Sequence, residues 1–323
     1  MRYRSLGRTG LQVSDIGFGA WGVGGDWWKG ENDEESLSSM RQAFELGVNF
    51  VDTANNYGNG HSEVVVGQAI RDWGRHIYVA SKVPPKNYTW PAAPGTPIKD
   101  VFPKEWIVER TEISLKNLGL ECIDLQQLHV WLDEWADQDE WKEAILQLKQ
   151  QGKVGAWGVS LNHPLEPDYC AEGIRTGLID VCQVVFNIFE QGPKEQLFPL
   201  AEQENVGIVV RCPLDEGALT GKITPDSSFP EGSFQDFYFK DDRKREVWQR
   251  TQALQFLLHG DVNSLPEAAL RFCLSFRAVS SVIVGMRTPA HARANIIASD
   301  KGALPAEDLV RLGSHAWPHN FWL

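Results

Sequence analysis

Residues 49–63 read Asn-Phe-Val-Asp-Thr-Ala-Asn-Asn-Tyr-Gly-Asn-Gly-His-Ser-Glu and contain a strand pattern, a turn and the start of a helix pattern. The apolar run ends on Asp52, and the Gly-rich turn that follows presents Tyr57. In folds built from strand–helix units, the carboxyl ends of the parallel strands gather on one face, and functional side chains stand there. The segment therefore predicts one strand–helix unit of the fold. It also predicts that part of a functional site lies at the end of its strand.

The same alternation of strand and helix patterns continues along the whole chain. Most of the expected strands are nearly continuous apolar runs, which is typical of parallel strands covered on both faces. We predict strands at residues 13–20, 49–53, 77–83, 123–130, 155–161, 181–188, 207–212 and 281–284. Amphipathic helices are expected at residues 33–46, 62–72, 104–117, 138–151, 167–176, 194–205, 265–276 and 289–299.

Eight such repeats can close into a (β/α)8 barrel or spread as an open doubly wound sheet. The turn after the first strand lacks the Gly-x-Gly-x-x-Gly spacing of dinucleotide-binding sheets. The count of eight favours an α/β barrel, formed by one domain over residues 1–323. Two long segments, residues 84–103 and 220–243, are expected as loops on the carboxyl-terminal face. They would be lids or binding loops, or plain surface loops.

Composition disfavours several classes of protein. The net charge of −12 disfavours nucleic acid and anionic membranes as partners. We find no 18-residue apolar run and no apolar segment in the first residues, so neither a membrane helix nor a signal peptide is expected. The five cysteines are widely spaced and include no Cys-x-x-Cys pair, which argues against structural zinc. Reduced thiols in a cytoplasmic protein are the simplest interpretation.

Four proton-handling groups stand at or just after the ends of expected strands: Asp52, Tyr57, Lys82 and His129. In a barrel these strands are neighbours, so the four side chains should converge. A nearby ammonium lowers the pKa of a tyrosine, so Lys82 is expected to make Tyr57 a better proton donor, with Asp52 keeping the lysine charged. His129 would orient the reacting oxygen. Taken singly, Asp52 could equally cap a helix, and Tyr57 and His129 could be ordinary core residues.

These segments resemble the aldo-keto reductase superfamily. Phe50-Val-Asp-Thr-Ala-Asn-Asn-Tyr-Gly is similar to the family segment Phe-x-Asp-Thr-Ala-x-x-Tyr-Gly. Residues 118–129, 152–160, 213–222 and 281–295 resemble later family segments, in the same order. The resemblance implies a barrel closed at its bottom by an amino-terminal hairpin over residues 1–13. It also implies hydride transfer from NADPH to an aldehyde or ketone, with Tyr57 as proton donor and no metal.

The resemblance also implies positions for the cofactor. Ser160 and Gln183 would hold the nicotinamide carboxamide, and Phe186 would stack on its ring. The backbone between Leu214 and Gly217 would embrace the pyrophosphate, as would the side chain of Lys222. The adenosine end would meet Gly285, Arg287, Thr288 and Asn295, with Arg287 and Thr288 at the 2′-phosphate. A helix-capping role for Thr288 is the alternative.

Thirteen tryptophans is a high number for this length. Trp21, Trp90 and Trp131 are expected at the barrel mouth, where aromatic walls suit an aromatic or aliphatic carbonyl or a sugar ring. Packing of loops against one another is the other interpretation. Neither the substrate nor the oligomeric state follows from the sequence.

Two further functions stay open beside carbonyl reduction. The first is a regulatory cofactor-binding protein of the potassium-channel β-subunit type, with bound cofactor as a redox sensor. The second is a metal-dependent hydrolase using Asp52 and His129. The complete set of four groups favours the reductase, and the hydrolase lacks a second cluster of histidines or carboxylates at strand ends.

Overall fold

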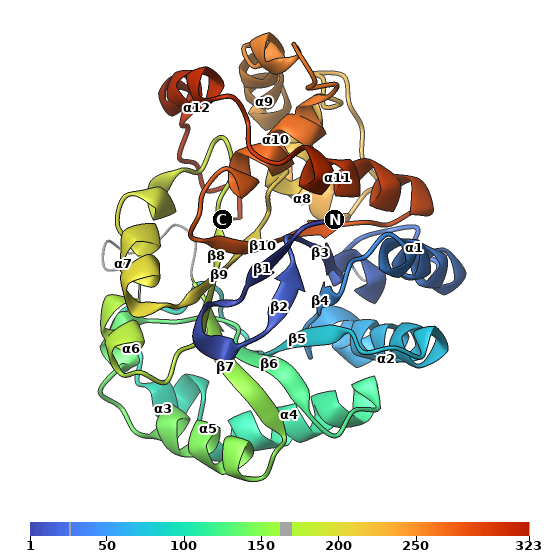
Figure 1. The fold of residues 1–323 in the computed structure, drawn as a ribbon. Helices are drawn as coiled ribbons and strands as arrows, with labels where there is room; N and C mark the ends of the chain where they lie inside the picture. The colour runs from blue at the N-terminus through green and yellow to red at the C-terminus, as the bar shows by residue number, and fades with distance from the viewer. Residues whose placement is uncertain (26, 162–169, 323) are drawn as a thin grey trace.

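The structure, a computed structural model, describes residues 1–25, 27–161 and 170–322. Eight parallel strands close into a barrel in the order β10-β3-β4-β5-β6-β7-β8-β9 (Figure 1). The predicted (β/α)8 barrel is therefore confirmed. The barrel strands are β3 (Ile16–Gly19), β4 (Phe50–Asp52), β5 (Tyr78–Val83), β6 (Ile123–Leu128), β7 (Val154–Ser160), β8 (Val181–Val185), β9 (Gly207–Arg211) and β10 (Val279–Gly285).

An antiparallel hairpin of β1 (Tyr3–Ser5) and β2 (Gln12–Ser14) lies across the amino-terminal end of the barrel (Figure 1). The predicted strand 13–20 is thus two strands, because the chain leaves the hairpin at Ser14 and enters the barrel at Ile16. Leu6 and Val13 of the hairpin segment are fully buried and pack with the apolar side chains inside the barrel. The hairpin therefore closes the bottom of the barrel, as expected.

Helices cover the outside of the barrel in chain order, with α1 beside α2 and α10 beside α11 (Figure 1). The first of them begins where expected, because the Asn32 side chain accepts hydrogen bonds from the N–H groups of Glu34 and Glu35. The helices are α1 (Asp33–Glu45), α2 (His61–Trp73), α3 (Ile98–Val101), α4 (Lys104–Leu118), α5 (Glu140–Gln150), α6 (Ala171–Arg175), α7 (Leu197–Glu204), α8 (Phe234–Tyr238), α9 (Arg243–Gln252), α10 (Leu265–Leu274), α11 (Pro289–Lys301) and α12 (Ala306–Leu312).

Several predicted boundaries differ from the structure. The strand predicted at 181–188 ends at Val185, because the Asn187 side chain accepts the N–H groups of Phe189 and Glu190 and makes a turn. The two predicted loops contain the short helices α3 and α8. Helix α9 was not predicted because its buried face is narrow. Part of the predicted helix 167–176 lies outside the described residues.

Side chains inside the barrel form layers, because successive inward-facing residues of a strand are two apart. The lower layer is apolar and includes Phe50, Ala80, Leu125, Val181 and Val209. Two residues further toward the carboxyl ends, the same strands carry polar side chains. We call this set the polar layer, and its members are Asp52, Lys82, Gln127, Gln183 and Arg211.

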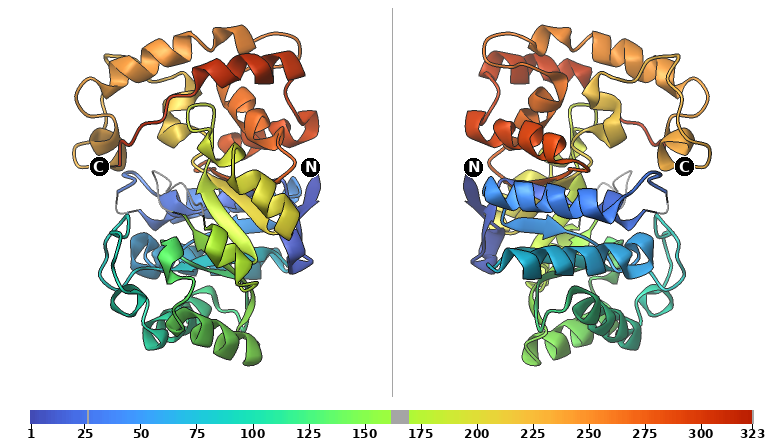
Figure 2. Two further views of the ribbon diagram at one scale, coloured as in Figure 1. Left: turned by 90° about the vertical axis from the view of Figure 1, so that its left-hand side faces the viewer. Right: turned by 90° about the vertical axis from the view of Figure 1, so that its right-hand side faces the viewer.

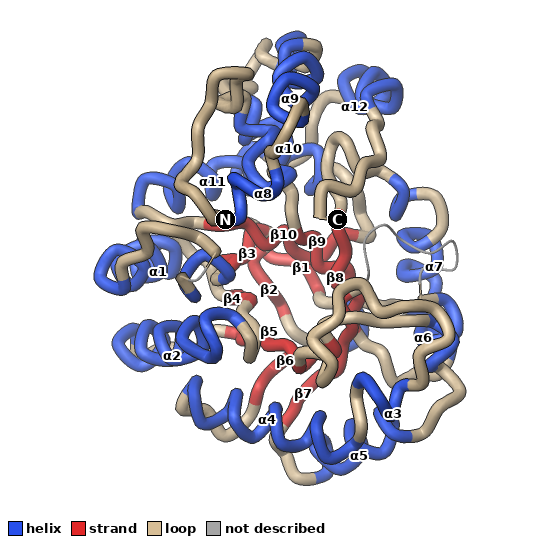
Figure 3. Tube along the Cα trace, turned by 180° about the vertical axis from the view of Figure 1, so that it is seen from behind, coloured by secondary structure: helices blue, strands red, loops and turns tan. Residues whose placement is uncertain are grey.

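The two ends of the chain lie at opposite ends of the barrel axis (Figure 2). Seen from the carboxyl-terminal side, long loops run across the barrel end (Figure 3). No helix among the described residues has the length and apolar character needed to cross a bilayer.

Candidate active site

The four predicted catalytic side chains converge at the carboxyl ends of β4, β5 and β6. The Lys82 ammonium donates hydrogen bonds to Asp52 Oδ1 at 2.5 Å and to the Thr53 carbonyl at 2.8 Å. It also lies 3.4 Å from the Tyr57 hydroxyl. The Tyr57 and His129 rings meet edge to face, with centroids 5.7 Å apart. A carboxylate, an ammonium, a phenol and an imidazole therefore lie together at this end of the barrel.

The polar layer supports this group from below. Gln183 donates to Asp52 Oδ2 at 2.7 Å, and Gln127 lies 3.4 Å from the same oxygen. Lys82 has no exposed surface, so burial lowers the pKa of its ammonium, while the Asp52 charge acts in the opposite direction. The lysine and the aspartate together form a buried, charge-balanced pair.

The pKa of Tyr57 does not follow the expectation that Lys82 would lower it. Burial raises the pKa of the phenol well above 10, and the Asp52 charge adds to this rise. Desolvation therefore outweighs the nearby cations, and Lys82 is already matched by Asp52. Burial, Lys82 and Arg211 together lower the pKa of His129 well below 6.5. At neutral pH the phenol is protonated and the imidazole is neutral.

A close backbone contact fixes the turn that carries Tyr57. Gly58 has a φ of 58°, and a Cβ atom on it would lie 2.1 Å from the Gly24 carbonyl oxygen. Only glycine fits this left-handed position against the neighbouring loop. The contact brings the segment Trp21–Gly24 onto the Tyr57 turn, with the Trp21 and Tyr57 rings 6.2 Å apart.

Two of the three predicted pocket tryptophans lie beside the catalytic rings. Trp21 is next to Tyr57, and the Trp90 ring is 5.7 Å from the His129 ring. Trp131 does not reach the mouth, because it is buried and packs edge to face on Trp135 and Trp141. Its predicted pocket role is therefore withdrawn.

The chain end contributes a tryptophan that the sequence analysis missed. Trp322 stacks on Trp21, with ring centroids 6.0 Å apart and an interplanar angle of 24°. The signal in the sequence was only the high tryptophan content, because nothing local places the last residues over the mouth. Trp322 thus becomes a third aromatic wall beside Trp21 and Trp90.

The nicotinamide residues implied by the resemblance do not all face the site. Ser160 ends β7 and Gln183 lies in the polar layer, both buried at the barrel mouth. Phe186 is fully buried against Phe272, with ring centroids 5.3 Å apart, and against Phe198. Strand alternation turns residue 186 outward, away from the inward-facing Gln183. The predicted stacking of Phe186 on the nicotinamide is therefore withdrawn.

Basic groups gather at the ends of β9 and β10. Burial lowers the pKa of His291, and the positive charges of Lys222 and Arg287 lower it further. Arg287 and His291 stand at the start of α11, where the helix dipole and free N–H groups favour anions. The turn from Leu214 to Gly217 follows β9. These residues fit the phosphates of a dinucleotide cofactor.

Two other predicted adenosine residues are engaged within the chain. The Thr288 hydroxyl accepts the N–H of His291 and caps α11, which is the alternative role considered above. The Asn295 amide donates to the carbonyl of Gly285 at 3.3 Å. Both side chains shape the end of β10.

Arg287 already has a carboxylate partner. Its Nε lies 2.7 Å from Glu31 Oε1, and a terminal nitrogen donates to the Lys29 carbonyl at 3.0 Å. The Glu31 side chain is only 12% exposed, and burial raises the pKa of this carboxyl. An acidic group therefore stands where the resemblance implies a 2′-phosphate.

Arg211 is a site residue that the sequence analysis missed. It ends β9 and lies two residues after the inward-facing Val209, so it belongs to the polar layer. Its Nη2 donates to the Leu161 carbonyl at 3.2 Å, and its guanidinium is 5.9 Å from the Trp322 ring. The signal was present, because Arg211 lies in the predicted strand 207–212.

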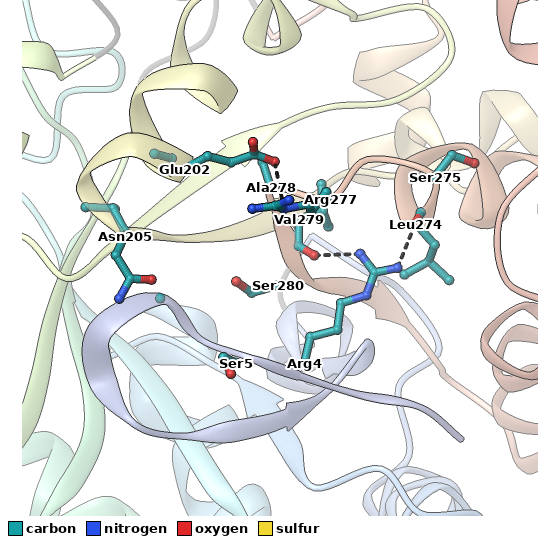
Figure 4. A pocket seen from close by; sticks show the side chains of 13 residues that line it. Arg4, Ser5, Glu202, Asn205, Leu274, Ser275, Arg277, Ala278, Val279 and Ser280 are labelled. Atoms are coloured by element: carbon teal, nitrogen blue, oxygen red, sulfur yellow. Dashed lines mark hydrogen bonds and ion pairs between the residues drawn. The ribbon is translucent and has the colours of Figure 1, made fainter.

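A cavity of about 670 Å³ lies at the other end of the barrel, between the hairpin and helices α7 and α10 (Figure 4). Arg4 lines it, but its guanidinium is used by the carbonyls of Leu274, Phe276 and Val279. The cavity therefore lacks the converging proton-handling groups of the carboxyl-terminal face, and we place the candidate active site at that face. The described residues gather no set of three His, Cys, Asp or Glu side chains suited to a metal ion, so this part of the chain offers no support for the hydrolase alternative.

Comparison with known proteins agrees with this geometry. A family model described as the aldo/keto reductase family matches residues 15–316. The chain belongs to the aldo/keto reductase family. The resemblance seen in the sequence is confirmed, and this aldo/keto reductase is an oxidoreductase of a family that reduces carbonyl compounds with a nicotinamide cofactor.

Relatives of this aldo/keto reductase carry different names. It is 30% identical over 294 residues to the aldo-keto reductase YhdN of Bacillus subtilis (strain 168), covering 90% of this chain and 86% of that protein. It is 27% identical to the NADH-specific methylglyoxal reductase of Escherichia coli (strain K12), covering 92% and 93%. It is 30% identical to a probable voltage-gated potassium channel subunit beta of Arabidopsis thaliana, covering 93% and 92%.

A solved structure shares the fold. The holo form of the aldo-keto reductase AKR11C1 from Bacillus halodurans is 28% identical, with a TM-score of 0.76, and the match covers 99% of this chain and 97% of that one. The barrel thus belongs to a family architecture.

Proposed function

We propose that this protein is an NADPH-dependent reductase of aldehydes or ketones, in which Tyr57 gives the proton. The observation that supports this most is the 3.4 Å contact between the Tyr57 hydroxyl and the ammonium of Lys82, which is itself paired with Asp52. The active unit is one domain over residues 1–323, and the protein acts in the cytoplasm. The cytoplasmic location is supported by five cysteines that form no disulfide.

Each of the four catalytic residues has its own role in carbonyl reduction. NADPH supplies the hydride when bound. The Tyr57 hydroxyl is protonated at neutral pH, since its pKa lies well above 10, so it can donate to the carbonyl oxygen as negative charge builds there. The Lys82 ammonium then faces the phenolate oxygen, and Asp52 keeps that ammonium charged. The neutral His129 ring positions the same oxygen by hydrogen bonding.

We expect the cofactor and the substrate to bind on the same carboxyl-terminal face of the barrel. The charges of Lys222 and Arg287 favour a phosphate-rich cofactor, and we expect Ser160 and Gln183 to hold its nicotinamide. Aromatic walls suit an aromatic carbonyl or a sugar ring stacked on its apolar face, and these walls are Trp21, Trp90 and Trp322.

A cofactor titration followed by a substrate screen tests the proposal. Purified protein is titrated with NADPH and with NADH by quenching of tryptophan fluorescence, then supplied with a panel of aldehydes and ketones. We expect consumption of reduced cofactor, measured by absorbance, with at least one carbonyl compound. Tight NADPH binding without turnover would contradict the reductase and favour the potassium-channel β-subunit alternative.

Glu31→Gln is expected to tighten NADPH binding by about twofold to tenfold, the effect of one partly screened charge. The carboxylate competes with a 2′-phosphate for Arg287, so removing its charge frees the guanidinium. Binding of NADH, which lacks that phosphate, should stay unchanged. The measurement is the ratio of the two dissociation constants.

Glu34→Gln is the matched control for Glu31→Gln, because Glu34 is exposed in the first turn of α1 and forms no ion pair with Arg287. It should leave the ratio unchanged. An unchanged ratio in Glu31→Gln as well would show that Arg287 does not meet the 2′-phosphate.

A further inference from the structure

One charged side chain at the barrel mouth has no role in the proposed reduction. Asp52 and Lys82 balance each other, while Tyr57 and His129 are neutral at neutral pH. Arg211 is the remaining charged member of the polar layer. Within the polar layer, no second carboxylate is present to balance it.

The hydrogen bonds of Arg211 leave part of its guanidinium unused. Its Nη2 donates to the Leu161 carbonyl, and its Nη1 lies 3.6 Å from Cys212 Sγ, which is a weak acceptor. Its Nε is shielded from solvent and has no hydrogen-bond partner among the described residues. A planar guanidinium with a free N–H edge suits a carboxylate better than any neutral group.

Glu216 is the acid whose charge interacts with that of Arg211. Glu216 accepts a hydrogen bond from Cys212 Sγ at 2.9 Å, and among the groups that shift its pKa the charge of Arg211 acts least. Burial raises the pKa of Glu216 to about 7, so this carboxyl is only partly ionised at neutral pH. The attraction of Arg211 for an anion therefore persists.

The surroundings of Arg211 point toward the reacting group. Arg211 is in register with Val185 of β8, and Gln183 of that strand donates to Asp52, so the guanidinium stands at the same barrel mouth as the catalytic group. The Trp322 ring, 5.9 Å away, shields the guanidinium from water and strengthens its field. A short substrate could thus touch Tyr57 and Arg211 at once.

We propose that Arg211 binds a carboxylate of the substrate, so that the preferred substrates are short oxo acids with the carboxylate near the reacting carbonyl. The inference rests on the proposed function and names the substrate class of the same site. Arg211 is then a specificity-determining residue that leaves the proton transfer itself to Tyr57.

Matched pairs of substrates test this inference. Short 2-oxo and 4-oxo acids are compared with their methyl esters, which keep the carbonyl and lose the charge. The wild-type protein should show a higher kcat/KM for the acids. Arg211→Gln should lower kcat/KM for the acids by about 10- to 100-fold, the effect of losing a charge-assisted hydrogen bond, and change that for the esters by less than about threefold.

Two variants control for charge and for folding. Arg211→Lys keeps the positive charge but loses the planar guanidinium. Its kcat/KM for the acids should lie between the values of the wild type and of Arg211→Gln. Arg245→Gln, on the exposed face of α9, should leave both substrate classes unchanged. Equal losses for acids and esters in Arg211→Gln, or no preference for acids in the wild type, would overturn the inference.

A binding measurement separates failure of this inference from failure of the proposed function. The oxo acid is titrated against the protein while the intrinsic tryptophan fluorescence is followed. Weaker binding in Arg211→Gln supports the carboxylate site even if no compound is turned over. If the esters are turned over and the oxo acid binds equally well to the wild type and to Arg211→Gln, the reductase function is supported and the carboxylate site is rejected.

Discussion

Tyr57→Phe is expected to lower kcat for carbonyl reduction by about 10²- to 10⁴-fold, the usual contribution of a general acid. The substitution removes the hydroxyl that faces Lys82 and keeps the ring that contacts Trp21 and His129. Cofactor affinity should therefore change little. Steady-state rates with the best carbonyl of the panel, together with fluorescence titration by NADPH, measure the two effects separately.

Tyr88→Phe is the matched control for Tyr57→Phe. Tyr88 lies on the same face of the barrel, in the loop with Trp90, and the residue is 57% exposed. It should retain wild-type turnover. Undiminished turnover in Tyr57→Phe would remove Tyr57 from the role of proton donor and point to another source of the proton.

Asp52→Asn is expected to lower the free energy of unfolding by about 3–5 kcal/mol, the cost of leaving a buried charge without its partner. Lys82 has no exposed surface and pairs with this carboxylate at 2.5 Å. Burial would then lower the pKa of Lys82 further below that of the unfolded chain. Since the unfolded state binds the extra proton, the stability of the variant should rise with pH toward the ordinary pKa of lysine, 10.5. Urea unfolding at several pH values measures both effects.

A second substitution identifies the source of that loss. Asp52→Asn combined with Lys82→Met removes the uncompensated ammonium and should recover much of the stability, while activity stays lost. Asp72→Asn, on the exposed face of α2, should change neither quantity. A double variant as unstable as Asp52→Asn would show that the ion pair does not explain the penalty.

The parts predicted best from the sequence are those set by strand ends. Asp52, Lys82 and His129 each end an apolar run, so closing the barrel was enough to bring them together. Phe186 was misplaced because its strand ends at Val185, and alternation then turns its ring outward. Trp131 was misplaced for a related reason, because proximity to His129 along the chain does not decide which way a loop side chain packs.

Contacts between distant segments could not be predicted in the same way. Glu31 and Arg287 meet because loops from opposite ends of the sequence become neighbours when β3 pairs with β10. The Gly58 contact with Gly24 likewise depends on how two loops approach each other. Arg211 was predictable in principle, since the inward register of its strand follows once Val209 is known to face the barrel interior.

The position of Trp322 has a practical consequence for handling the protein. The tail that carries it is tied down by the Arg243 hydrogen bond to the Phe321 carbonyl at 2.9 Å and by His319, whose ring is 3.3 Å from Asp215. An affinity tag fused after residue 323 would begin next to the aromatic walls of the mouth, whereas Met1 lies at the far end of the barrel (Figure 2). Purification tags belong at the amino terminus, and a carboxyl-terminal fusion that alters substrate profiles would report on the tail and not on the chemistry.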